Sequence, residues 1–417
     1  MSIPEPVKGA PDWLPPDSAA FDAVEEAFLC VARSAGYERI RTPVFEHTEV
    51  FARGVGASTD VVQKEMYTFS DKGGRSLTLR PEGTAGVMRA ALTAGVPRSG
   101  GLPVKYTYAG EFFRHERPQA GRQRQFNQVG VEALGSDDPV LDAEVVLLGW
   151  EALQRAGLRD VTLRLNTLGD REDRPAYAER LNAYLDSVGE LPPDVEVRRH
   201  MNPLRAFDSK APGMAEAMAG APLLADHVSA EAKSHHHTVV ALLEAEGVPI
   251  TADPRLVRGL DYYTRTTFEY QAAGLGAQNA VGGGGRYDGL AEDLGSGQRF
   301  PGIGWALGVD RTLLALQGSG RTEPRSARVQ AFLVHAPGLE QEAFSLVSAL
   351  RRAGISADLA FGGRSFKSQF KAADRSGATW ALVLGPDEAE RGVVTVKDLR
   401  SGEQRKVARA EMITALR

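Results

Sequence analysis

Two β-rich segments that follow each other closely, residues 104–116 and 126–134, constrain the fold of this chain more than any other feature. A short connection can join antiparallel strands, whereas parallel strands need a crossover of about a dozen residues or more. Segment 161–166 has the same β-rich character, and helical patterns occupy 17–35 and 140–157. We therefore predict a main domain of the α+β class, in which helices flank an antiparallel sheet.

The length of 417 residues exceeds what one simple core supports, so two or three domains are expected. Residues from about 171 to 247 are helical in pattern and rich in Ala and Glu, which predicts a helical insertion in a sheet-based domain spanning 1–324. The segment GSGRTEPRSAR at 318–328 has the composition of a linker. Strand and helix patterns alternate beyond it, so residues 325–417 are predicted to form an α/β domain with a largely parallel sheet.

Charge is distributed unevenly along the chain. From residue 325 onward there are 15 lysines and arginines against 10 aspartates and glutamates, whereas the whole chain has a net charge of −5. A basic C-terminal unit could dock a polyanion, although an excess of this size could also arise by chance in a small domain.

Several classes of protein do not fit the composition. No apolar run approaches the ~20 residues needed to span a bilayer, and the start MSIPEPVKGAPDWLPPDS lacks the apolar core of a signal peptide. The single cysteine, Cys30, is expected in the core and excludes an internal disulfide framework or a thiolate metal site. His235, His236 and His237 are expected at a surface helix start, because consecutive helical side chains cannot converge on one ion. We expect a cytoplasmic protein without a membrane partner and without a metal site of its own.

The segment EFFRHERPQAGRQRQFNQ, residues 111–128, collects cations where an ordinary surface hairpin would alternate its charges. Alternate residues of a strand share a face, so the hairpin could place a cation, aromatic rings, an amide and a carboxylate together. The residues concerned are Phe112, Arg114, Glu116, Phe126, Gln128, Gly130 and Glu132. Arginine binds phosphate through two parallel hydrogen bonds, and no GxxxxGK[ST] loop is present. We predict a nucleotide bound on a sheet; the alternative is a solvated sheet face.

The hairpin segment and six other segments occur in the order typical of one family, and together they cover nearly the whole chain. FRHERPQAGRQRQFNQVGVEALG resembles motif 2 of class II aminoacyl-tRNA synthetases, and specifically of the histidyl-tRNA synthetase family. The other matching segments are GYERIRTPVFE (motif 1), TLRPEGTAG, NPLRAFDSK, LVRGLDYYTRTTFE, GGGGRYDGL and PGIGWALGVDRTLLAL (motif 3). GAPD at 9–12 departs from the family, which usually has a threonine after the glycine.

The resemblance implies a two-step reaction. The carboxylate of L-histidine attacks the α-phosphorus of ATP to give histidyl-adenylate and pyrophosphate, and the 3′ end of tRNA(His) then takes the histidyl group. Arg114 and Arg258 are the implied catalytic residues that hold the α-phosphate; Arg258 also reaches the histidine carboxylate. A structural arginine paired with Asp261 is the alternative for Arg258. The implied ATP-binding residues are Arg114, Glu116, Arg122, Phe126 and Arg311, with Arg124 as a weaker candidate, and Mg²⁺ would bridge the β- and γ-phosphates.

For histidine, the resemblance implies that the ammonium group meets Glu82 and Thr84, with Gln128 near the ammonium or the carboxylate. Glu132 and the hydroxyl of Tyr263 would contact the imidazole nitrogens, with Tyr262 nearby. Core packing remains the alternative for Phe126, and a carboxylate paired with a core arginine is the alternative for Glu132.

The family also implies a homodimer through motif 1 and an anticodon-binding C-terminal domain. The basic residues there that could contact tRNA are Arg351, Arg352, Arg364, Lys367, Lys371 and Arg375. A competing interpretation is a non-catalytic relative that serves as the regulatory subunit of ATP phosphoribosyltransferase; a general RNA-binding module is a third.

Overall fold

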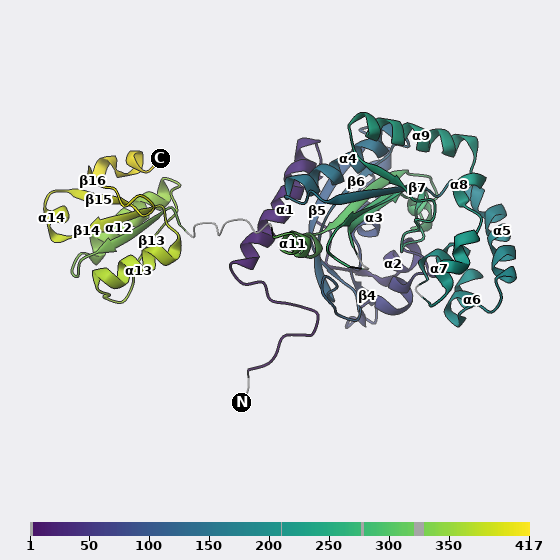
Figure 1. Cartoon of the computed structure of the whole chain (residues 1–417), viewed down its shortest axis with the longest axis horizontal. Coiled ribbons are helices and arrows are strands. Elements are labelled where there is room, and N and C mark those ends of the chain that lie inside the picture. The colour runs from purple at the N-terminus through teal and green to yellow at the C-terminus, as the bar shows by residue number, and fades with distance from the viewer. Residues whose placement is uncertain (1–2, 210, 277–278, 321–328) are drawn as a thin grey trace. The chain divides into compact units, whose positions relative to one another are not determined.

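The chain divides into two compact units, Met1–Thr322 and Glu323–Arg417, in the computed structural model (Figure 1). The structure describes residues 3–209, 211–276, 279–320 and 329–417. The boundary predicted between residues 324 and 325 lies outside the described residues.

An eight-stranded sheet forms the centre of the first unit, with the order β1-β5-β6-β11-β10-β9-β7-β8. All neighbouring strands pair antiparallel except β1 with β5 and β7 with β8, at the two edges. The predicted antiparallel sheet is therefore confirmed. The strands are β1 (Glu38–Arg39), β5 (Val104–Phe113), β6 (Gln125–Leu134), β7 (Val161–Thr167), β8 (Ile250–Ala252), β9 (Thr264–Ala272), β10 (Ala280–Arg286) and β11 (Gly302–Gly308).

The glycine run of β10 lets this strand approach its neighbours closely. A Cβ on Gly284 would overlap the carbonyl group of Gly304 on β11, and a Cβ on Gly283 would lie 2.5 Å from the Phe268 carbonyl oxygen on β9. Only glycine fits such an approach of two backbones. The run therefore shapes the middle of the sheet, where the polar side chains of the neighbouring strands gather.

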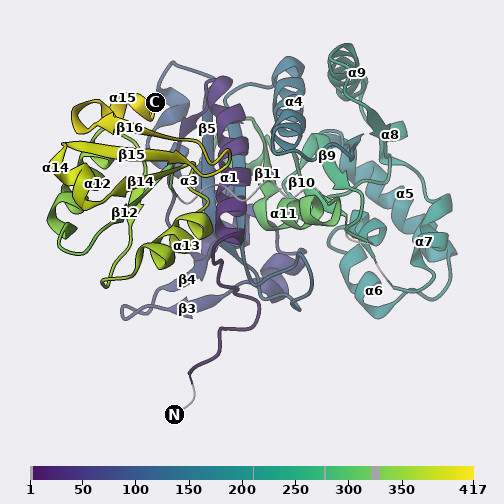
Figure 2. The same ribbon diagram turned by 60° about the vertical axis from the view of Figure 1, so that its left-hand side comes forward.

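One face of the sheet is covered by helices and holds the main hydrophobic core. α1 (Asp17–Ser34), α4 (Pro139–Arg155), α9 (Ala230–Ala245) and α11 (Val309–Gly318) contribute side chains to this core (Figure 2). Val129, Val131 and Ala133 of β6 point to the same core. By the period of two in a strand, the residues between them point to the opposite face. Cys30 of α1 is partly exposed and outside this core, so its expected burial was wrong.

The opposite face is bounded by smaller elements. They are α2 (Thr48–Gly54), α3 (Thr84–Thr93), α10 (Leu290–Asp293) and a three-stranded sheet of β2 (Phe45–His47), β3 (Thr68–Ser70) and β4 (Ser76–Leu79). Val87 and Met88 of α3 pack with Tyr108 and Phe112 of β5 in a second core. These side chains leave the cavity described below between α3 and the sheet.

A helical segment joins β7 to β8. It comprises α5 (Arg174–Ser187), α6 (Pro193–Arg199), the 3-10 helix η4 (Pro203–Asp208), α7 (Met214–Ala217), α8 (Leu224–His227) and α9. Buried apolar side chains such as Tyr177, Leu181 and Leu204 join it to the second core of the sheet. The elements α5 to α8 thus pack on the same side of the sheet as the cavity, whereas α9 reaches the main core on the other side.

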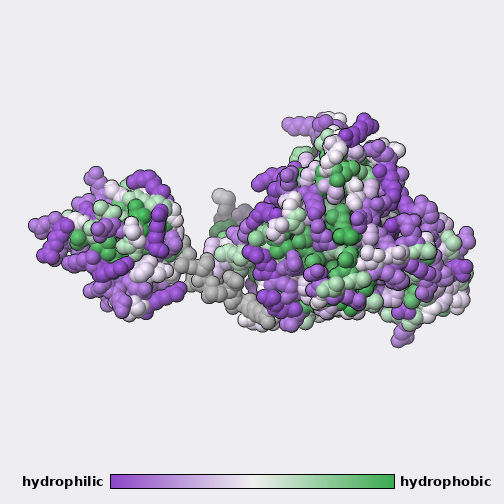
Figure 3. Space-filling view, turned by 90° about the horizontal axis from the view of Figure 1, so that it is seen from above, coloured by the Kyte–Doolittle hydropathy of each residue, from purple (hydrophilic) through white to green (hydrophobic). Residues whose placement is uncertain are grey.

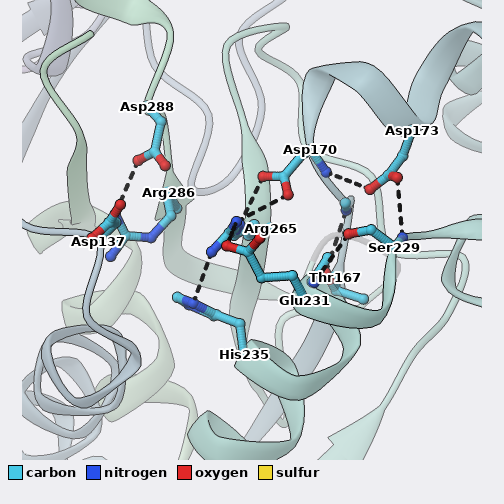
Figure 4. Close-up of polar contacts among 12 residues, drawn as sticks. Asp137, Thr167, Asp170, Asp173, Ser229, Glu231, His235, Arg265, Arg286 and Asp288 are labelled. Carbon is cyan, nitrogen blue, oxygen red and sulfur yellow. Dashed lines mark hydrogen bonds and ion pairs between the residues drawn. The ribbon is translucent and has the colours of Figure 1, made fainter.

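His235 on α9 corrects one expectation, since its side chain is buried rather than on the surface. Its Nε2 lies 2.8 Å from a carboxylate oxygen of Asp142, and its Nδ1 lies 3.4 Å from Arg265. Figure 4 shows Arg265 between Asp170, Glu231 and His235. Local periodicity could not reveal this network, because its members come from α4, α9 and β9.

The second unit has a five-stranded sheet with the order β13-β12-β14-β15-β16. Only β12 pairs parallel with β13 and β14, while β15 pairs antiparallel with β14 and β16. The sheet is therefore mixed, and the expectation of a largely parallel sheet was wrong. Its elements are β12 (Ala331–His335), α12 (Glu340–Arg352), β13 (Ala357–Leu359), α13 (Phe366–Ser376), β14 (Trp380–Leu384), α14 (Pro386–Glu390), β15 (Val393–Asp398), β16 (Gln404–Ala408) and α15 (Met412–Ala415).

Polar residues cover most of the visible face of each unit, and a band of apolar residues crosses the face of the first unit (Figure 3). Among the described helices, none combines the length and the apolar character needed to cross a bilayer.

Candidate active site

The β5–β6 pairing brings the side chains of the arginine-rich hairpin together on the face opposite the main core. Phe112 is the cross-strand partner of Phe126, and their ring centroids lie 6.2 Å apart. Gly130 lies opposite Tyr108, and a Cβ on Gly130 would overlap the Tyr108 ring. The two strand faces therefore coincide, and the condition that the sequence left open is met.

A cavity of about 590 Å³ lies on this face. Its lining comes from the start of α3, the hairpin, the segment before β9, the glycine run of β10, and the junction of β11 with α11. The segment 58–65 and three residues of the helical segment, Arg198, Arg205 and Asp208, also line it. The predicted site residues that line it are Glu82, Thr84, Arg114, Glu116, Arg122, Phe126, Gln128, Arg258, Tyr262, Tyr263 and Arg311. Eleven of the twelve predicted site residues therefore line the cavity, and Glu132 does not. Arg124, which was named in addition to the twelve, does not line it either.

Glu132 is fully buried directly behind the cavity wall. Gly304 lines the cavity, and a Cβ at that position would overlap the Glu132 carboxylate. Three hydroxyls donate to this carboxylate: Thr84 at 2.7 Å, Tyr108 at 3.2 Å, and Tyr287. Burial raises the pKa of Glu132 to about 8, although the hydrogen bonds from Tyr287 and Thr84 oppose the shift. Glu132 is therefore paired with hydroxyl groups and not with a core arginine.

Glu82 is held by the beginning of α3. Its carboxylate accepts hydrogen bonds from the backbone N–H groups of Thr84, at 2.6 Å, and Ala85, at 2.9 Å. The Tyr262 hydroxyl lies 3.4 Å from the same carboxylate. Burial raises the pKa of Glu82, and the two backbone hydrogen bonds oppose that shift. The carboxylate is thus fixed in direction while it faces the cavity.

Arg258 forms an ion pair with Glu269 of β9. Asp261, the partner considered from the sequence, is instead 2.6 Å from a guanidinium nitrogen of Arg205. A Cβ on Gly283 would lie 3.1 Å from the Arg258 guanidinium carbon, so the glycine run gives this guanidinium its room. Arg258 therefore faces the cavity with one carboxylate beside it.

The hairpin supplies the other cationic part of the lining. The Arg114 guanidinium lies over the Phe126 ring, 5.4 Å from its centroid, and its Nε donates to the Pro81 carbonyl at 2.9 Å. Arg122 and Glu116 form an ion pair at 2.6 Å. An aromatic ring beside a guanidinium can take up a nucleobase next to its phosphates.

Arg311, in the first turn of α11, connects the tip of the hairpin to the beginning of β10. It donates to the carbonyl of Ala280 at 2.5 Å and to the carbonyl of Gly121 at 2.8 Å. Burial lowers the pKa of Arg311, and the charge of Arg122 lowers it further. Arg311 thereby ties the hairpin tip to the first residue of β10.

Oε1 of Gln128 is a buried polar atom of the lining that accepts no hydrogen bond within the described part of the chain. Leaving such an atom unpaired costs on the order of 1–3 kcal/mol. A polar ligand in the cavity would satisfy it, which supports the assignment of the cavity as a binding site.

Sequence reasoning missed Tyr108, Tyr287 and Glu269 as site residues. Tyr108 shares the face of Phe112 on β5, so strand periodicity could have found it. Tyr287 lies within GGGGRYDGL and Glu269 ends LVRGLDYYTRTTFE, but no local pattern says that they turn toward Glu132 and Arg258.

The described residues contain no cluster of three or more His, Cys, Asp or Glu side chains arranged to hold a metal ion. Glu65 and Glu116 both line the cavity, and burial together with the charge of Glu116 raises the pKa of Glu65. One or two carboxylates suit Mg²⁺ when substrate phosphates and water supply its other ligands.

Comparison with known proteins identifies relatives along the whole chain. The family described as Histidyl-tRNA synthetase matches residues 9–169 and 185–312, and the family described as Anticodon binding domain matches residues 329–417. A Histidine–tRNA ligase of Corynebacterium urealyticum is 54% identical over 98% of this chain and 96% of its own length. A relative of the same name from Mycobacterium bovis is 53% identical over 98% of this chain and 97% of its own.

Solved structures agree with these relatives. The crystal structure of apo S. aureus histidyl-tRNA synthetase superposes with a TM-score of 0.83 at 36% identity, covering 100% of this chain and 99% of that chain. A Bacillus halodurans structure, described as an ATP phosphoribosyltransferase regulatory subunit/histidyl-tRNA synthetase, has a TM-score of 0.65. It covers 91% of this chain and 97% of that chain, and its identity of 21% shows a shared fold alone.

Proposed function

Because the chain belongs to the histidyl-tRNA synthetase family, we propose that its cavity binds histidine beside ATP and activates the amino acid there. The chain is an aminoacyl-tRNA ligase that joins histidine to tRNA, with ATP as a substrate. The alternative, a regulatory subunit without catalysis, is not favoured, since the curated relatives at 52–54% identity are ligases.

The first step forms a bond between a carboxylate oxygen of histidine and the α-phosphorus, and it breaks the bond to the β-phosphate oxygen. Negative charge increases on the α-phosphate as pyrophosphate leaves, so fixed cations must face it. Arg114 and Arg258 come from distant parts of the chain and line the same cavity. This convergence is the observation that carries the assignment of the two arginines to the α-phosphate.

The second step forms an ester between the histidyl carbonyl carbon and a hydroxyl at the 3′ end of tRNA(His), and AMP leaves. We assign the binding of that tRNA partly to residues 329–417, which match the anticodon-binding family. Arg351, Arg352, Arg364, Lys367, Lys371 and Arg375 remain the proposed phosphate contacts.

For histidine, we assign its ammonium to Glu82 and Thr84, with Gln128 next to it, and its imidazole to Tyr263 and Glu132. The fixed carboxylate of Glu82 and the unpaired Oε1 of Gln128 support the first assignment. Glu132 lies behind Gly304, which lines the cavity. The assignment of Glu132 to the imidazole therefore requires that the imidazole pack directly against Gly304. A site that pairs buried polar groups with its ligand rejects analogues that lack them.

For ATP, we assign the adenine to Phe126 and the phosphates to Arg114, Arg122 and Arg311. Glu116, paired with Arg122, completes the nucleotide contacts. Mg²⁺ accompanies ATP in this proposal and supplies positive charge at the β- and γ-phosphates. Glu65 and Glu116 are the carboxylates that would hold it.

Three further features are proposed on the family resemblance. They are a homodimer formed through motif 1, a cytoplasmic location, and a catalytic domain that ends near residue 324. Sedimentation of the purified chain at several concentrations tests the dimer.

Histidine-dependent exchange between ATP and radioactive pyrophosphate tests the function directly. We expect exchange with L-histidine and none with other amino acids, because only the imidazole satisfies the Glu132 and Tyr263 positions. Addition of tRNA(His) then yields histidyl-tRNA. Absence of histidine-dependent exchange in the folded full chain would contradict the proposal and revive the regulatory-subunit alternative.

A further inference from the structure

Two arginines of the helical segment reach the stretch that carries Arg258 and Tyr263. Arg205 of η4 donates to the main-chain carbonyl of Arg258 at 2.8 Å. Arg174, the first residue of α5, donates to the main-chain carbonyl of Tyr263. The acceptors are therefore the carbonyl groups of Arg258, assigned to the α-phosphate, and of Tyr263, assigned to the imidazole.

Arg205 makes more than this single contact. Its side chain is 6% exposed, and its second terminal nitrogen lies 2.6 Å from the Asp261 carboxylate. The Asn202 amide also donates to Asp261 at 2.8 Å, and Ser58 donates to the same carboxylate from the other side. Arg205 and its neighbour thus hold both the beginning and the middle of the stretch 258–263.

The stretch has little regular structure of its own to fix it. Residues 258–263 precede β9 and contain neither helix nor strand. Asp261 N–H donates to Val55 at 3.0 Å, and Gly259 has no atom within 4 Å of where a Cβ would be. The side chains of Tyr262 and Tyr263 are buried in the second core. Hydrogen bonds from charged donors are stronger than neutral ones, so the two arginines add strong contacts to the backbone of this stretch.

We propose that Arg205 and Arg174 are positioning residues through which the helical segment holds Arg258 and Tyr263 against the substrates. This inference rests on the proposed function, because it assigns the control of that same site. Arg205 also lines the cavity, whereas Arg174 does not. In this proposal Arg205 acts through the backbone at Arg258, and Arg174 acts through the backbone at Tyr263. A purely structural role would instead lower the yield of folded protein and leave each folded site unchanged.

The test uses the full chain with Arg205→Gln, Arg174→Gln and the conservative Arg205→Lys. Arg199→Gln is the matched control, because Arg199 lies in α6 of the same helical segment and pairs with Asp186 and Glu196 within it. For each variant, the concentration of active sites is first titrated by the burst of adenylate formation. The KM for histidine, the KM for ATP and the exchange rate per active site are then measured, together with the melting temperature.

We expect Arg205→Gln to raise the histidine KM by about tenfold or more and to lower the exchange rate per site, as loss of a charged hydrogen bond implies. The ATP KM should change by less, since the hairpin and Arg311 carry most of the ATP contacts. Arg174→Gln should change the same constants in the same direction, Arg205→Lys should recover part of the loss, and Arg199→Gln should leave them at wild-type values.

The proposal is overturned if Arg205→Gln and Arg174→Gln have wild-type constants per active site, or if Arg199→Gln alters them equally. If Arg205→Gln does not fold, Arg174→Gln and Arg205→Lys decide by the same criteria. Failure of the wild-type chain to exchange pyrophosphate with histidine would instead overturn the proposed function, so the two failures are distinguishable.

Discussion

The two ends of the cavity solve different physical problems. At the proposed histidine end, Glu132 is fully buried and accepts from three hydroxyls, and the N–H groups of α3 hold Glu82. At the proposed nucleotide end, Arg122 remains 40% exposed and pairs with Glu116. The first end is preorganised and shielded from water, whereas the second offers positive charge that solvent still reaches.

This difference teaches where specificity and rate should arise. A buried polar cluster discriminates between ligands, because a wrong ligand leaves a desolvated group such as Oε1 of Gln128 unpaired. Partly exposed cations discriminate little, but they neutralise charge that develops during the reaction. Substitutions at the two ends should therefore separate into effects on histidine affinity and effects on adenylate formation.

Arg258→Ala should have the largest effect, because Arg258 is assigned to both ends. Removing one preorganised donor to a developing charge costs on the order of 10²–10³ in rate. We expect single-turnover adenylate formation to fall by about that factor while the circular dichroism spectrum and melting curve stay near wild type. Near-normal adenylation would refute the role of Arg258 and leave its ion pair with Glu269 as a structural feature.

Glu132→Gln tests the histidine end alone. The substitution keeps the size of the side chain but replaces one carboxyl oxygen with an amide NH2 group, so the imidazole loses an acceptor. A buried donor left without its acceptor costs about 1–3 kcal/mol, which predicts a histidine KM raised by roughly 5- to 100-fold. The ATP KM should stay near its wild-type value, measured in the same exchange assay.

An unchanged histidine KM in Glu132→Gln would show that the imidazole does not reach past Gly304. Equal increases in the histidine KM and the ATP KM would show that the histidine end and the nucleotide end of the cavity are not independent. Phe126→Leu is a useful control, because Phe126 is assigned to adenine and should raise the ATP KM alone.

Much of this arrangement follows from local sequence patterns. Alternation predicts which residues of β5 share a face and which residues of β6 do so. The pairing of Phe112 with Phe126 depends on the register between the strands, which the structure supplies. The order of the strands could not be predicted in this way, because nothing in the local pattern of β10 or β11 indicates that they continue the sheet beside β6. The contact of Tyr287 with Glu132 depends on that order, and the sequence could not show it.

The helical segment and the second unit also contain features that local sequence patterns could not predict. His235 looks like a surface residue beside two other histidines, yet it is buried because α9 packs on α4 and meets Asp142. Strand β16 was not predicted, because the sequence QRKVA is mostly polar and lacks the alternation of a half-buried strand. In the structure only Val407 of this strand is buried. Patterns predict faces of single elements well, but they do not say which element will cover a face.

Stability as a function of pH gives the smallest effect and tests the burial of Glu132 without any substrate. Burial raises the pKa of Glu132 to about 8 in the folded chain, whereas an exposed glutamate has a pKa near ~4.3. Between these values the folded state holds a proton that the unfolded state has released. Stability from this group is therefore fully present below the unfolded pKa and declines as pH rises toward 8.

Glu132→Gln cannot lose a proton, so the melting temperature of this variant relative to wild type should increase as pH is raised from 6 to 7.5. The corresponding change in the free energy of unfolding is at most about 1.4 kcal/mol per pH unit for one proton. A difference that stays constant with pH would mean that Glu132 is ionised throughout, held in that form by its three hydroxyl donors, and the proposed histidine end would then carry a fixed negative charge.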